Sequence, residues 1–284
     1  MRIKIFIVAI LFTLIYSFDV STQNKMKVIS YNTHKAFQND SIIQKQYINW
    51  VKKINPDIVA YQEMNKFTQK GLEEFAAHYG HPYAVLSMAE GNRNPVALSS
   101  KYPIVNVQKV VDNMWHTYLY ANINNIHFFV VHFSSSFYMK RAQELRIVLA
   151  HAATLPKDDR ILIMGDFNAF SRKDAENYGE DLFNNMKDRD EEHDQQNLNN
   201  GELDYSVTDQ MISAGYKDAY WLVNEHFKHS LPTKKYLTRS VRRIDYIWAN
   251  SVMAKEIIKS DIIHDNDTDE MSDHYPMYIE YYSK

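Results

Sequence analysis

The stretch ILIMGDFNAF (161–170) ends an apolar run with two polar residues placed two apart, Asp166 and Asn168. A short apolar run of this kind is typical of a buried β-strand, and Gly165 would allow the chain to turn after it. Asp and Asn are common at strand ends because their side chains hydrogen-bond the turning backbone. Residues two apart also share one side of an extended segment, so both side chains could instead face one ligand. The stretch alone leaves both interpretations open.

Polar residues follow apolar runs at five other places in the chain. Each has an ordinary explanation as a cap, a turn former or a core histidine bonded to the backbone. Glu63 and Asp245 are harder to explain in this way, because a carboxylate among buried apolar residues is costly unless it is paired or bound to a cation. The full set is Asn32, Glu63, His132, Asp166, Asn168, Asp245, Asp273 and His274. Together they predict one constellation at the end of a sheet sandwich.

The sequence excludes several common catalytic devices. It has no cysteine, so thiolate metal sites, a cysteine nucleophile and disulfides are all ruled out. Its seven glycines include no two that are two residues apart, so a GxGxxG dinucleotide loop is absent. The motifs GxxxxGK, GxSxG and HExxH are absent as well. What remains is acid–base and metal chemistry carried by Asp, Glu, Asn and His.

The composition sets the scale of the molecule. With 284 residues, 45% of them hydrophobic, the chain can form one large domain or two small ones with a sizeable core. A formal net charge of −3 gives no global attraction to nucleic acid or to an anionic membrane.

The N-terminus differs from the rest of the chain. Arg2 and Lys4 precede the nearly apolar run IFIVAILFTLIYSF (5–18), which describes a secretory signal peptide over 1–22 better than a membrane span of about 20 residues. An uncleaved membrane anchor is the alternative. The signal peptide predicts a secreted or periplasmic protein whose single domain covers 24–284. The lack of cysteine is compatible with export, because a core of this size does not need disulfides.

Strand and helix patterns alternate along that domain. Amphipathic helices are predicted at 39–54, about 67–79 and 140–155. Strands are predicted at 26–34, 57–64, 82–87, 95–100, 104–111, 117–123, 126–133, 161–164, 242–250 and 273–282. Several strands adjoin without a helix between them, which favours two mixed sheets packed together with helices outside over a doubly wound parallel sheet.

One segment, about 171–205, is a polar insertion. It has eleven acidic residues against four basic ones and few apolar residues, so we predict a solvated surface loop. A calcium-binding or substrate-screening role is the alternative, although the acids lack the spacing of a known calcium loop.

Six motifs occur in an order that resembles the endonuclease/exonuclease/phosphatase superfamily: SYNTH, NPDIVAYQEM, VVHF, GDFNAF, RRIDYIW and MSDHYPM. The resemblance covers about residues 26–282. That group includes deoxyribonuclease I-like nucleases, bacterial sphingomyelinases and inositol-polyphosphate phosphatases. It implies a deoxyribonuclease I-like α/β fold, a four-layer sandwich of two mixed β-sheets flanked by helices. A phosphoester-cleaving site is then expected at one edge of the two sheets.

The resemblance also implies roles for individual residues. Glu63 matches the family's metal-binding glutamate, Asn32 matches the asparagine beside it, and Asp273 is a further candidate for the metal sphere. Asp166 and Asn168 match the pair that handles the attacking water. Oxygen ligands of this kind suit a hard ion, Mg²⁺ first, with Mn²⁺ or Ca²⁺ as alternatives. Zinc fits less well, although the two histidines keep it open.

Two histidines complete the implied site. His274 matches the histidine that pairs with an aspartate, here Asp245. His132 matches a second histidine found in the deoxyribonuclease I-like, sphingomyelinase and inositol-phosphatase branches. Apurinic-site repair nucleases have a tyrosine in that role, so the sequence points away from them. Which of Asp166, His132 and His274 is the base stays open.

The candidate substrate contacts are less specific. Many relatives carry Gly-Asn before an aiLSxxPI segment, and this asparagine is a substrate contact. This chain has RNPVALSSKYPI instead, so the asparagine is not at its usual place. Arg93 or Asn94 could replace it, or the two residues could belong to an ordinary Asn-Pro turn. The basic stretch PTKKYLTRSVRR (232–243), which includes Arg239, is either a solvated loop or an edge that follows phosphates.

These features together predict an exported, divalent-metal-dependent phosphodiesterase or endonuclease that hydrolyses nucleic acid by direct attack of water. We expect it to act as a monomer, without a stable protein partner. One alternative is a lipid or sugar-phosphate phosphoesterase of the sphingomyelinase or inositol-phosphatase type. A membrane-docking hairpin would favour the lipid substrate, and SSSFYMK (134–140) is the candidate for it. A non-catalytic binding protein on the same fold is the lesser alternative.

Overall fold

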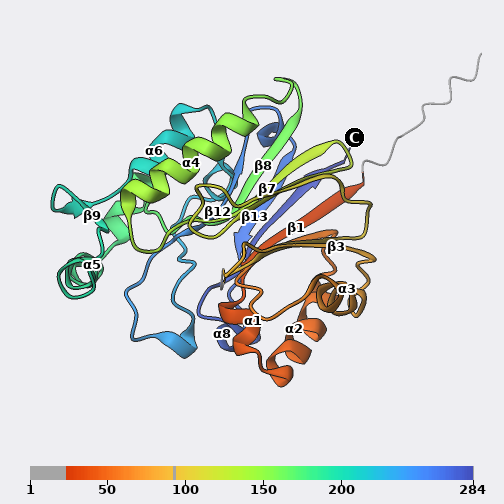
Figure 1. Cartoon of the computed structure of the whole chain (residues 1–284), viewed down its shortest axis with the longest axis horizontal. Helices are drawn as coiled ribbons and strands as arrows, with labels where there is room; N and C mark the ends of the chain where they lie inside the picture. Colours follow the sequence, from red (N-terminus) through yellow and green to blue (C-terminus); the bar gives the residue numbers. More distant parts are fainter. Residues whose placement is uncertain (1–23, 92–93, 284) are drawn as a thin grey trace, which may run out of the picture.

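Two six-stranded sheets pack face to face, and helices cover both outer faces (Figure 1). The computed structural model describes residues 24–91 and 94–283, so the predicted signal peptide lies outside the described residues. Among the described residues, no helix is both long and apolar enough to cross a membrane. The four layers confirm the prediction of a sandwich of two mixed sheets flanked by helices.

The first sheet has the strand order β13-β14-β1-β2-β4-β3. Its strands are β1 (Lys25–Asn32), β2 (Ile58–Gln62), β3 (Tyr83–Ser87), β4 (Val96–Ser100), β13 (Ile257–Ile262) and β14 (Met277–Tyr282). The central strands β1 and β2 run parallel, with Asn32 opposite Gln62. Their carboxyl ends therefore lie together, which places Asn32 beside Glu63, the residue that follows β2.

The second sheet has the strand order β11-β12-β8-β7-β6-β5. Its strands are β5 (Val105–Val110), β6 (Tyr118–Ile123), β7 (Ile126–His132), β8 (Arg160–Asp166), β11 (Lys217–Asp218) and β12 (Asp245–Ala249). Strand β7 runs parallel to β8 with His132 opposite Asp166, and β12 runs antiparallel to β8 with Asp245 opposite the same residue. The register alone therefore groups three of the predicted site residues.

The helices divide between the two outer faces (Figure 1). Helices α1 (His34–Gln38), α2 (Ser41–Ile54), α3 (Gln69–Ala77) and α8 (Thr268–Met271) lie on the side of the first sheet, and α4 (Tyr138–Ala152) and α6 (Ser206–Ser213) cover the second. Helix α2 begins where the sequence predicts, because the Asp40 side chain accepts a hydrogen bond from the Ile42 N–H. Helix α7 (Ala219–Val223) contacts β12 and β13.

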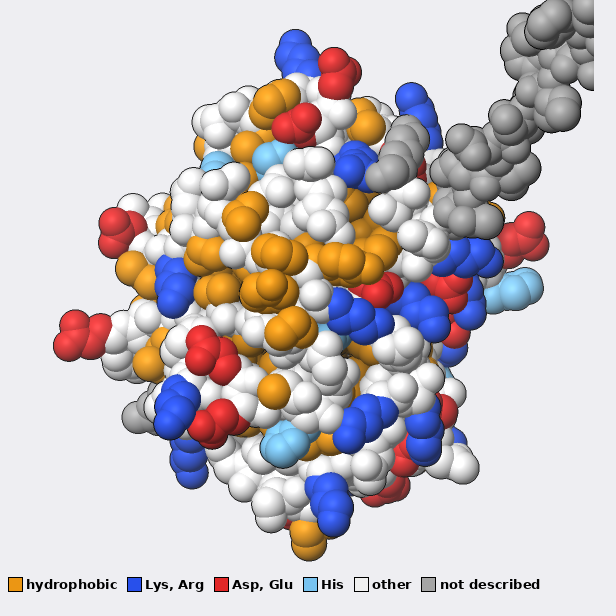
Figure 2. Space-filling model, turned by 90° about the vertical axis from the view of Figure 1, so that its right-hand side faces the viewer, with side chains coloured by type: hydrophobic (Ala, Val, Ile, Leu, Met, Phe, Trp, Pro, Cys, Tyr) orange, Lys and Arg blue, Asp and Glu red, His pale blue; other side chains and the backbone are white. Residues whose placement is uncertain are grey.

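Alternation along the strands produces three apolar layers. Val28 and Leu162 face the core between the sheets, whereas their neighbours Ile29 and Ile163 face the outer helices. On the side where β1 begins, hydrophobic side chains reach the surface in a band flanked by charged residues (Figure 2). The polar constellation lies toward the other end of β1, where that strand ends at Asn32.

Three details of the sequence prediction are corrected. Asp245 begins β12 rather than lying inside a strand. Asp273 and His274 do not open the last strand, which begins only at Met277, after Pro276. Strand β13 and the helices α6 and α7 were not predicted.

The prediction that 171–205 is a solvated loop is wrong. The segment contains a 3₁₀ turn (Arg172–Asn177), helix α5 (Glu180–Glu192) and a ribbon of β9 (Leu198–Asn199) and β10 (Glu202–Leu203). Leu182 and Met186, four residues apart on α5, pack into a small core with Phe170, Leu231 and Ile244. The low overall apolar content of the segment hides this pair.

A glycine is needed at position 165 because the backbone of a neighbouring strand lies very close to it, not because the chain turns there. It lies within β8 with φ +141°, and a Cβ added there would lie 2.0 Å from the backbone oxygen of Val131. The next residue is Asp166, so this glycine sets how closely β7 and β8 meet beside the site.

We predict that Gly165→Ala lowers the free energy of unfolding by about 3 kcal/mol or more, because backbone atoms must move apart. The control is Gly201→Ala, where φ is +80° but the added Cβ meets nothing within 4 Å. It should cost only about 1 kcal/mol, the strain of a left-handed backbone. Urea denaturation of both variants measures the difference. Equal losses would contradict the close approach.

Candidate active site

A pocket of about 380 Å³ opens where these strands end. Of the residues that the sequence singles out, it is lined by Glu63, Asn94, His132, Asp166, Asn168, Arg239, Asp273 and His274. Asn32 and Asp245 are buried behind them, each hydrogen-bonded to a lining residue. Arg93 lies outside the described residues. The structure therefore brings together every predicted site residue that it describes.

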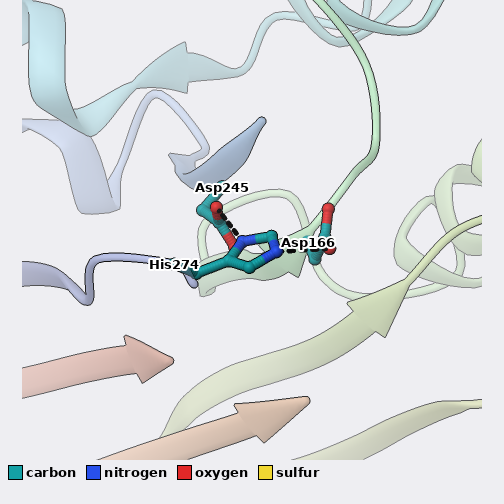
Figure 3. Close-up of side chains that lie close together, drawn as sticks. All are labelled: Asp166, Asp245 and His274. Carbon is teal, nitrogen blue, oxygen red and sulfur yellow. Dashed lines mark hydrogen bonds and ion pairs between the residues drawn. The ribbon is translucent and has the colours of Figure 1, made fainter. Parts of the chain in front are cut away.

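Asp245, His274 and Asp166 form a buried line (Figure 3). His274 Nδ1 lies 2.8 Å from Asp245 Oδ2, and its Nε2 lies 3.9 Å from Asp166 Oδ2. Burial on its own lowers the pKa of His274, but Asp245, Asp273 and Asp166 outweigh burial and raise the pKa to about 10. With this pKa the ring is an imidazolium at neutral pH, with one N–H donated to Asp245 and the other 3.9 Å from both Asp166 Oδ2 and Asp273 Oδ1.

Asp166 has an environment that balances its two protonation states. Burial, together with the charge of Asp245, raises the pKa of this carboxyl to about 7. The charge of His274, the Asn168 backbone N–H at 2.8 Å and the Asn32 amide at 3.0 Å act in the opposite direction. A carboxylate with a pKa near neutrality can take up a proton and release it again.

Asn168 supports Asp166 through a turn, one of the two interpretations that the sequence left open. Its backbone is left-handed (φ 48°), so the two residues do not lie on one extended segment. The turn brings the Asn168 N–H back onto Asp166 Oδ1, while the Asn168 side-chain amide donates to the Phe133 carbonyl at 3.1 Å. Both interpretations of the opening stretch therefore apply: the pair forms a turn, and both residues line the pocket.

Glu63 lines another wall of the pocket, and Asn32 is buried behind it. The Asn32 amide lies 3.3 Å from Glu63 Oε1 as well as 3.0 Å from Asp166, and so connects the two carboxylates. The Lys35 backbone N–H donates to Glu63 Oε2 at 3.0 Å. Glu63 itself has a left-handed backbone (φ 62°).

The backbone before α2 is strained beside this wall. The six consecutive residues of 34–39, which include the segment labelled α1, have φ between 45° and 58° and so form a left-handed turn. Such a turn costs about 1–2 kcal/mol for each residue with a side chain. It aims the Lys35 N–H at Glu63. Clusters of strained backbone are most often found at functional sites.

Asp273 remains ionised in spite of its burial. Burial raises the pKa of this carboxyl, but His274, His34 and Arg239 outweigh burial and hold the pKa below its ordinary value. Arg239 donates directly to Asp273 Oδ2, and His34 Nδ1 lies 3.7 Å from Oδ1. Arg239 is therefore at the site, but part of its charge is already neutralised.

His132 is a neutral ring in the same pocket. It is buried and stacks on His116 with a centroid separation of 4.4 Å, and its Nε2 lies 3.5 Å from Asp166 Oδ2. Burial, reinforced by the charge of His274, lowers the pKa of His132 to about 3. His132 therefore faces Asp166 without a charge, whereas His274 faces it with one.

Two sets of side chains could hold a cation. Asp166, Asp245 and His274 offer ligand atoms within 4.8 Å of one another. However, a charged imidazolium has no free lone pair for a metal, and Asp245 is already paired with it. Glu63, Asn32 and Asp273 offer carboxylate and amide oxygens instead, although Asp273 is itself paired with Arg239. They are the hard donors that Mg²⁺ prefers, so the residues fit such an ion.

Sequence reasoning missed several pocket residues. They are His34, Lys35, Trp115, His116, Ser135, Ser136, Arg189, Leu231 and Ile244. Ile244 precedes Asp245 in RRIDYIW, so that motif carried a signal for it, and Arg242 belongs to the basic stretch 232–243 that the sequence singled out. Arg189 comes from α5 and only the folded structure brings it to the pocket.

Comparison with known proteins agrees with this geometry. The family model for the Endonuclease/Exonuclease/phosphatase family matches residues 30–274. No curated protein matches the chain. Solved structures do, at identities that show the fold alone. An AP endonuclease from Archaeoglobus fulgidus has a TM-score of 0.67 at 19% identity, covering 90% of this chain and 99% of its own.

Two further structures have the same fold. A 3′ phosphatase from Neisseria, bound to a product DNA hairpin, has a TM-score of 0.67 at 17% identity, covering 90% of this chain and 99% of its own. An endonuclease/exonuclease/phosphatase from Beutenbergia cavernae has a TM-score of 0.65 at 15% identity, covering 91% of this chain and 72% of its own.

We predict that His274 keeps its proton far above the ordinary histidine pKa of 6.5, until the pH approaches about 10. Because the pKa is raised on folding, the ion pair stabilises the protein fully below pH 6.5, and this stability is lost as the pH rises through about 10. Titration of ¹⁵N-labelled histidines by NMR in EDTA measures this directly.

Asp245→Asn is the matched variant, because it removes the charge and keeps the shape. It should shift the His274 titration to markedly lower pH. A wild-type His274 that titrates near 6.5 would overturn the ion pair.

Proposed function

The chain belongs to the endonuclease/exonuclease/phosphatase family and is a hydrolase of phosphate esters, and we propose that it is a divalent-metal-dependent phosphodiesterase that cleaves nucleic acid by direct attack of water. The observation that carries the proposal is the pairing of Asp166, with a pKa of about 7, and the imidazolium of His274 in one pocket. One can accept a proton from water, and the other can stabilise the charge that then develops.

Asp166 is the proposed base. The Asn168 N–H and the Asn32 amide fix its carboxylate at the wall of the pocket, where it can hold a water molecule. His274 cannot take this role because it is already protonated at neutral pH. The pKa of His132, about 3, makes that ring a poor base as well. Among the three candidates that the sequence left open, these pKa values support Asp166 as the base.

His274 and His132 are the proposed hydrogen-bond partners of the phosphoryl group. The imidazolium of His274 offers an N–H and a positive charge to a phosphoryl oxygen or to the leaving oxygen, and Asp245 keeps it charged. His132 offers a second hydrogen bond without adding charge. A phosphodiester is an anion that repels nucleophiles, so such donors lower the barrier to attack.

Glu63, Asn32 and Asp273 are the proposed metal ligands. Mg²⁺ is the preferred ion because the donors are oxygens, with Mn²⁺ or Ca²⁺ as alternatives. When bound, the ion withdraws electron density from a phosphoryl oxygen and offsets negative charge.

Nucleic acid is the preferred substrate. Arg189, Arg239 and Arg242 line the pocket together with Trp115, a combination that suits phosphates and bases. The segment 134–140 is not the apolar hairpin expected of a membrane-docking sphingomyelinase: Ser134 is buried, and Tyr138 already begins α4. The arginines keep a sugar-phosphate substrate as the second candidate. Arg239 and Asn94 remain proposed substrate contacts.

The remaining parts of the proposal concern where the enzyme is located and its oligomeric state. Residues 1–22 are the basis for proposing export to the periplasm or the exterior, with a membrane anchor as the alternative. We further propose that it works as a monomer.

We predict that residues 24–284 nick supercoiled plasmid in Mg²⁺ and not in EDTA. Asp166→Ala should lower the rate by at least about 10³-fold, the scale of a lost general base. Asp158→Ala removes an exposed carboxylate outside the pocket and should leave the rate unchanged.

The controls separate the parts of the proposal. Intact plasmid under Mg²⁺, Mn²⁺ and Ca²⁺ would refute the nuclease assignment and move attention to sugar phosphates and phospholipids. Full activity in EDTA would overturn the metal requirement alone.

A further inference from the structure

The polar insertion brings an arginine into the active-site pocket. Arg189 lies near the end of α5, and the insertion is fixed to the loop before α4 by backbone hydrogen bonds. The Gln196 N–H donates to the Ser136 carbonyl at 2.9 Å, and the Tyr138 N–H donates to the Gln196 carbonyl at 2.7 Å. The Asp190 carboxylate accepts the N–H groups of the strand that follows, at 2.7–2.8 Å. These contacts hold α5 in place relative to the pocket.

The side chain of Arg189 is held at one end only. Its Nη2 donates to the Ser135 carbonyl at 2.9 Å and its Nε donates to Gln195 at 3.0 Å. Within the described residues, Nη1 makes no hydrogen bond. The guanidinium thus has a fixed orientation, and the residue lines the pocket.

Arg242 is the second cation at this place. It lies partly buried before β12, and its Nη1 donates to the Ser240 carbonyl at 3.0 Å. Burial and the charges of Arg189 and Arg239 lower the pKa of Arg242 to about 10. The nearby arginine charges therefore repel one another in the absence of an anion.

The ion pairs of the three arginines differ. Arg239 is paired with Asp273, whereas the hydrogen bonds of Arg189 and Arg242 within the described part of the chain go to carbonyl and amide oxygens rather than to carboxylates. Two partly buried guanidinium groups without a carboxylate are costly unless an anion joins them. Guanidinium groups bind phosphate with two parallel hydrogen bonds, so phosphate is the anion that suits them.

The two arginines would hold such a phosphate at a place next to the phosphate that is cleaved, not at the same place. Arg242 feels the charges of Asp166 and Asp273, so it borders the catalytic carboxylates. Arg189 reaches the same pocket from α5, outside the two sheets, and its charge also acts on Arg242. An anion between Arg189 and Arg242 would thus lie beside the scissile phosphate.

We propose that Arg189 and Arg242 form an accessory anion subsite that binds a second phosphate of the substrate, next to the phosphodiester being cleaved. This inference rests on the proposed function and deepens it. The favoured substrate is a nucleic-acid strand in which a neighbouring phosphate contributes to binding, rather than a diester with a single phosphate. The polar insertion, which supplies Arg189, then has a role in recognition.

The test uses short single-stranded oligonucleotides of one sequence. In the first, one central phosphodiester is flanked only by uncharged methylphosphonate linkages. In the second and third, the neighbouring phosphate is restored on the 5′ side or on the 3′ side. A fourth has phosphate throughout. The quantity compared is kcat/KM for cleavage of the central bond. We expect one of the two restored phosphates to raise kcat/KM by about tenfold, the value of one charge-assisted contact.

Variants of Arg189 then test whether this residue causes the preference for a neighbouring phosphate. Arg189→Ala should reduce it to about twofold or less, and Arg189→Lys should keep part of it because the charge remains while the fork is lost. Lys187→Ala is the matched control: it removes one exposed positive charge from the same helix and should keep the full preference. A merely structural effect of Arg189→Ala would lower kcat/KM for all substrates equally.

The outcomes distinguish the two proposals. No cleavage of the all-phosphate strand would refute the proposed function. Cleavage with equal kcat/KM for the first three strands, or cleavage of the all-phosphate strand alone, would refute the accessory subsite and leave the phosphodiesterase assignment standing. A preference that survives in Arg189→Ala, or one that Lys187→Ala removes as well, would also refute the assignment of the subsite to Arg189.

Discussion

The buried ion pair between His274 and Asp245 is the interaction on which the rest of the site depends. The two groups lie 2.8 Å apart where bulk water is excluded, so each is stable as an ion only because of the other and of the nearby carboxylates. Because the ring stays charged, it offers hydrogen bonds rather than lone pairs. The strand register supplies the third member: β8 and β12 pair so that Asp166 lies opposite Asp245. Charge, strand register and burial therefore place Asp245 as the partner of the His274 ring and leave Asp166 as the proposed base.

The residues proposed for catalysis and those proposed for substrate recognition come from different parts of the fold. Strand ends in the two sheets supply the groups proposed to act on water and on the phosphoryl oxygens, and these strands are held by a continuous apolar core. The arginines come from outside the sheets, Arg189 from the insertion and Arg239 from the loop before β12. Rigid elements therefore hold the groups proposed to react, while connecting segments, which can vary without disturbing the core, supply the proposed substrate contacts.

The sequence predicted most of the strands and the catalytic constellation because both depend on local pattern. Glu63 and Asp166 follow short apolar runs, and Asp40 is a recognisable cap of α2. What it did not predict depends on tertiary contacts. The turn at Asn168 is bonded to a neighbouring strand, and α5 is stabilised by a small core drawn from distant segments. Arg189 has no local feature that separates it from the other charged residues of the insertion.

The central claim is that the Asp166–His274–Asp245 line carries a proton and that the cation binds on the side of Glu63. Crystals of residues 24–284 grown with Mn²⁺, and an anomalous difference map at the manganese edge, test this most directly. We expect a peak within coordination distance of the Glu63 carboxylate, and no peak between Asp245 and His274. A peak bound by His274 would show that this ring is a neutral ligand, and would contradict the roles of both His274 as a charged donor and Asp166 as the base.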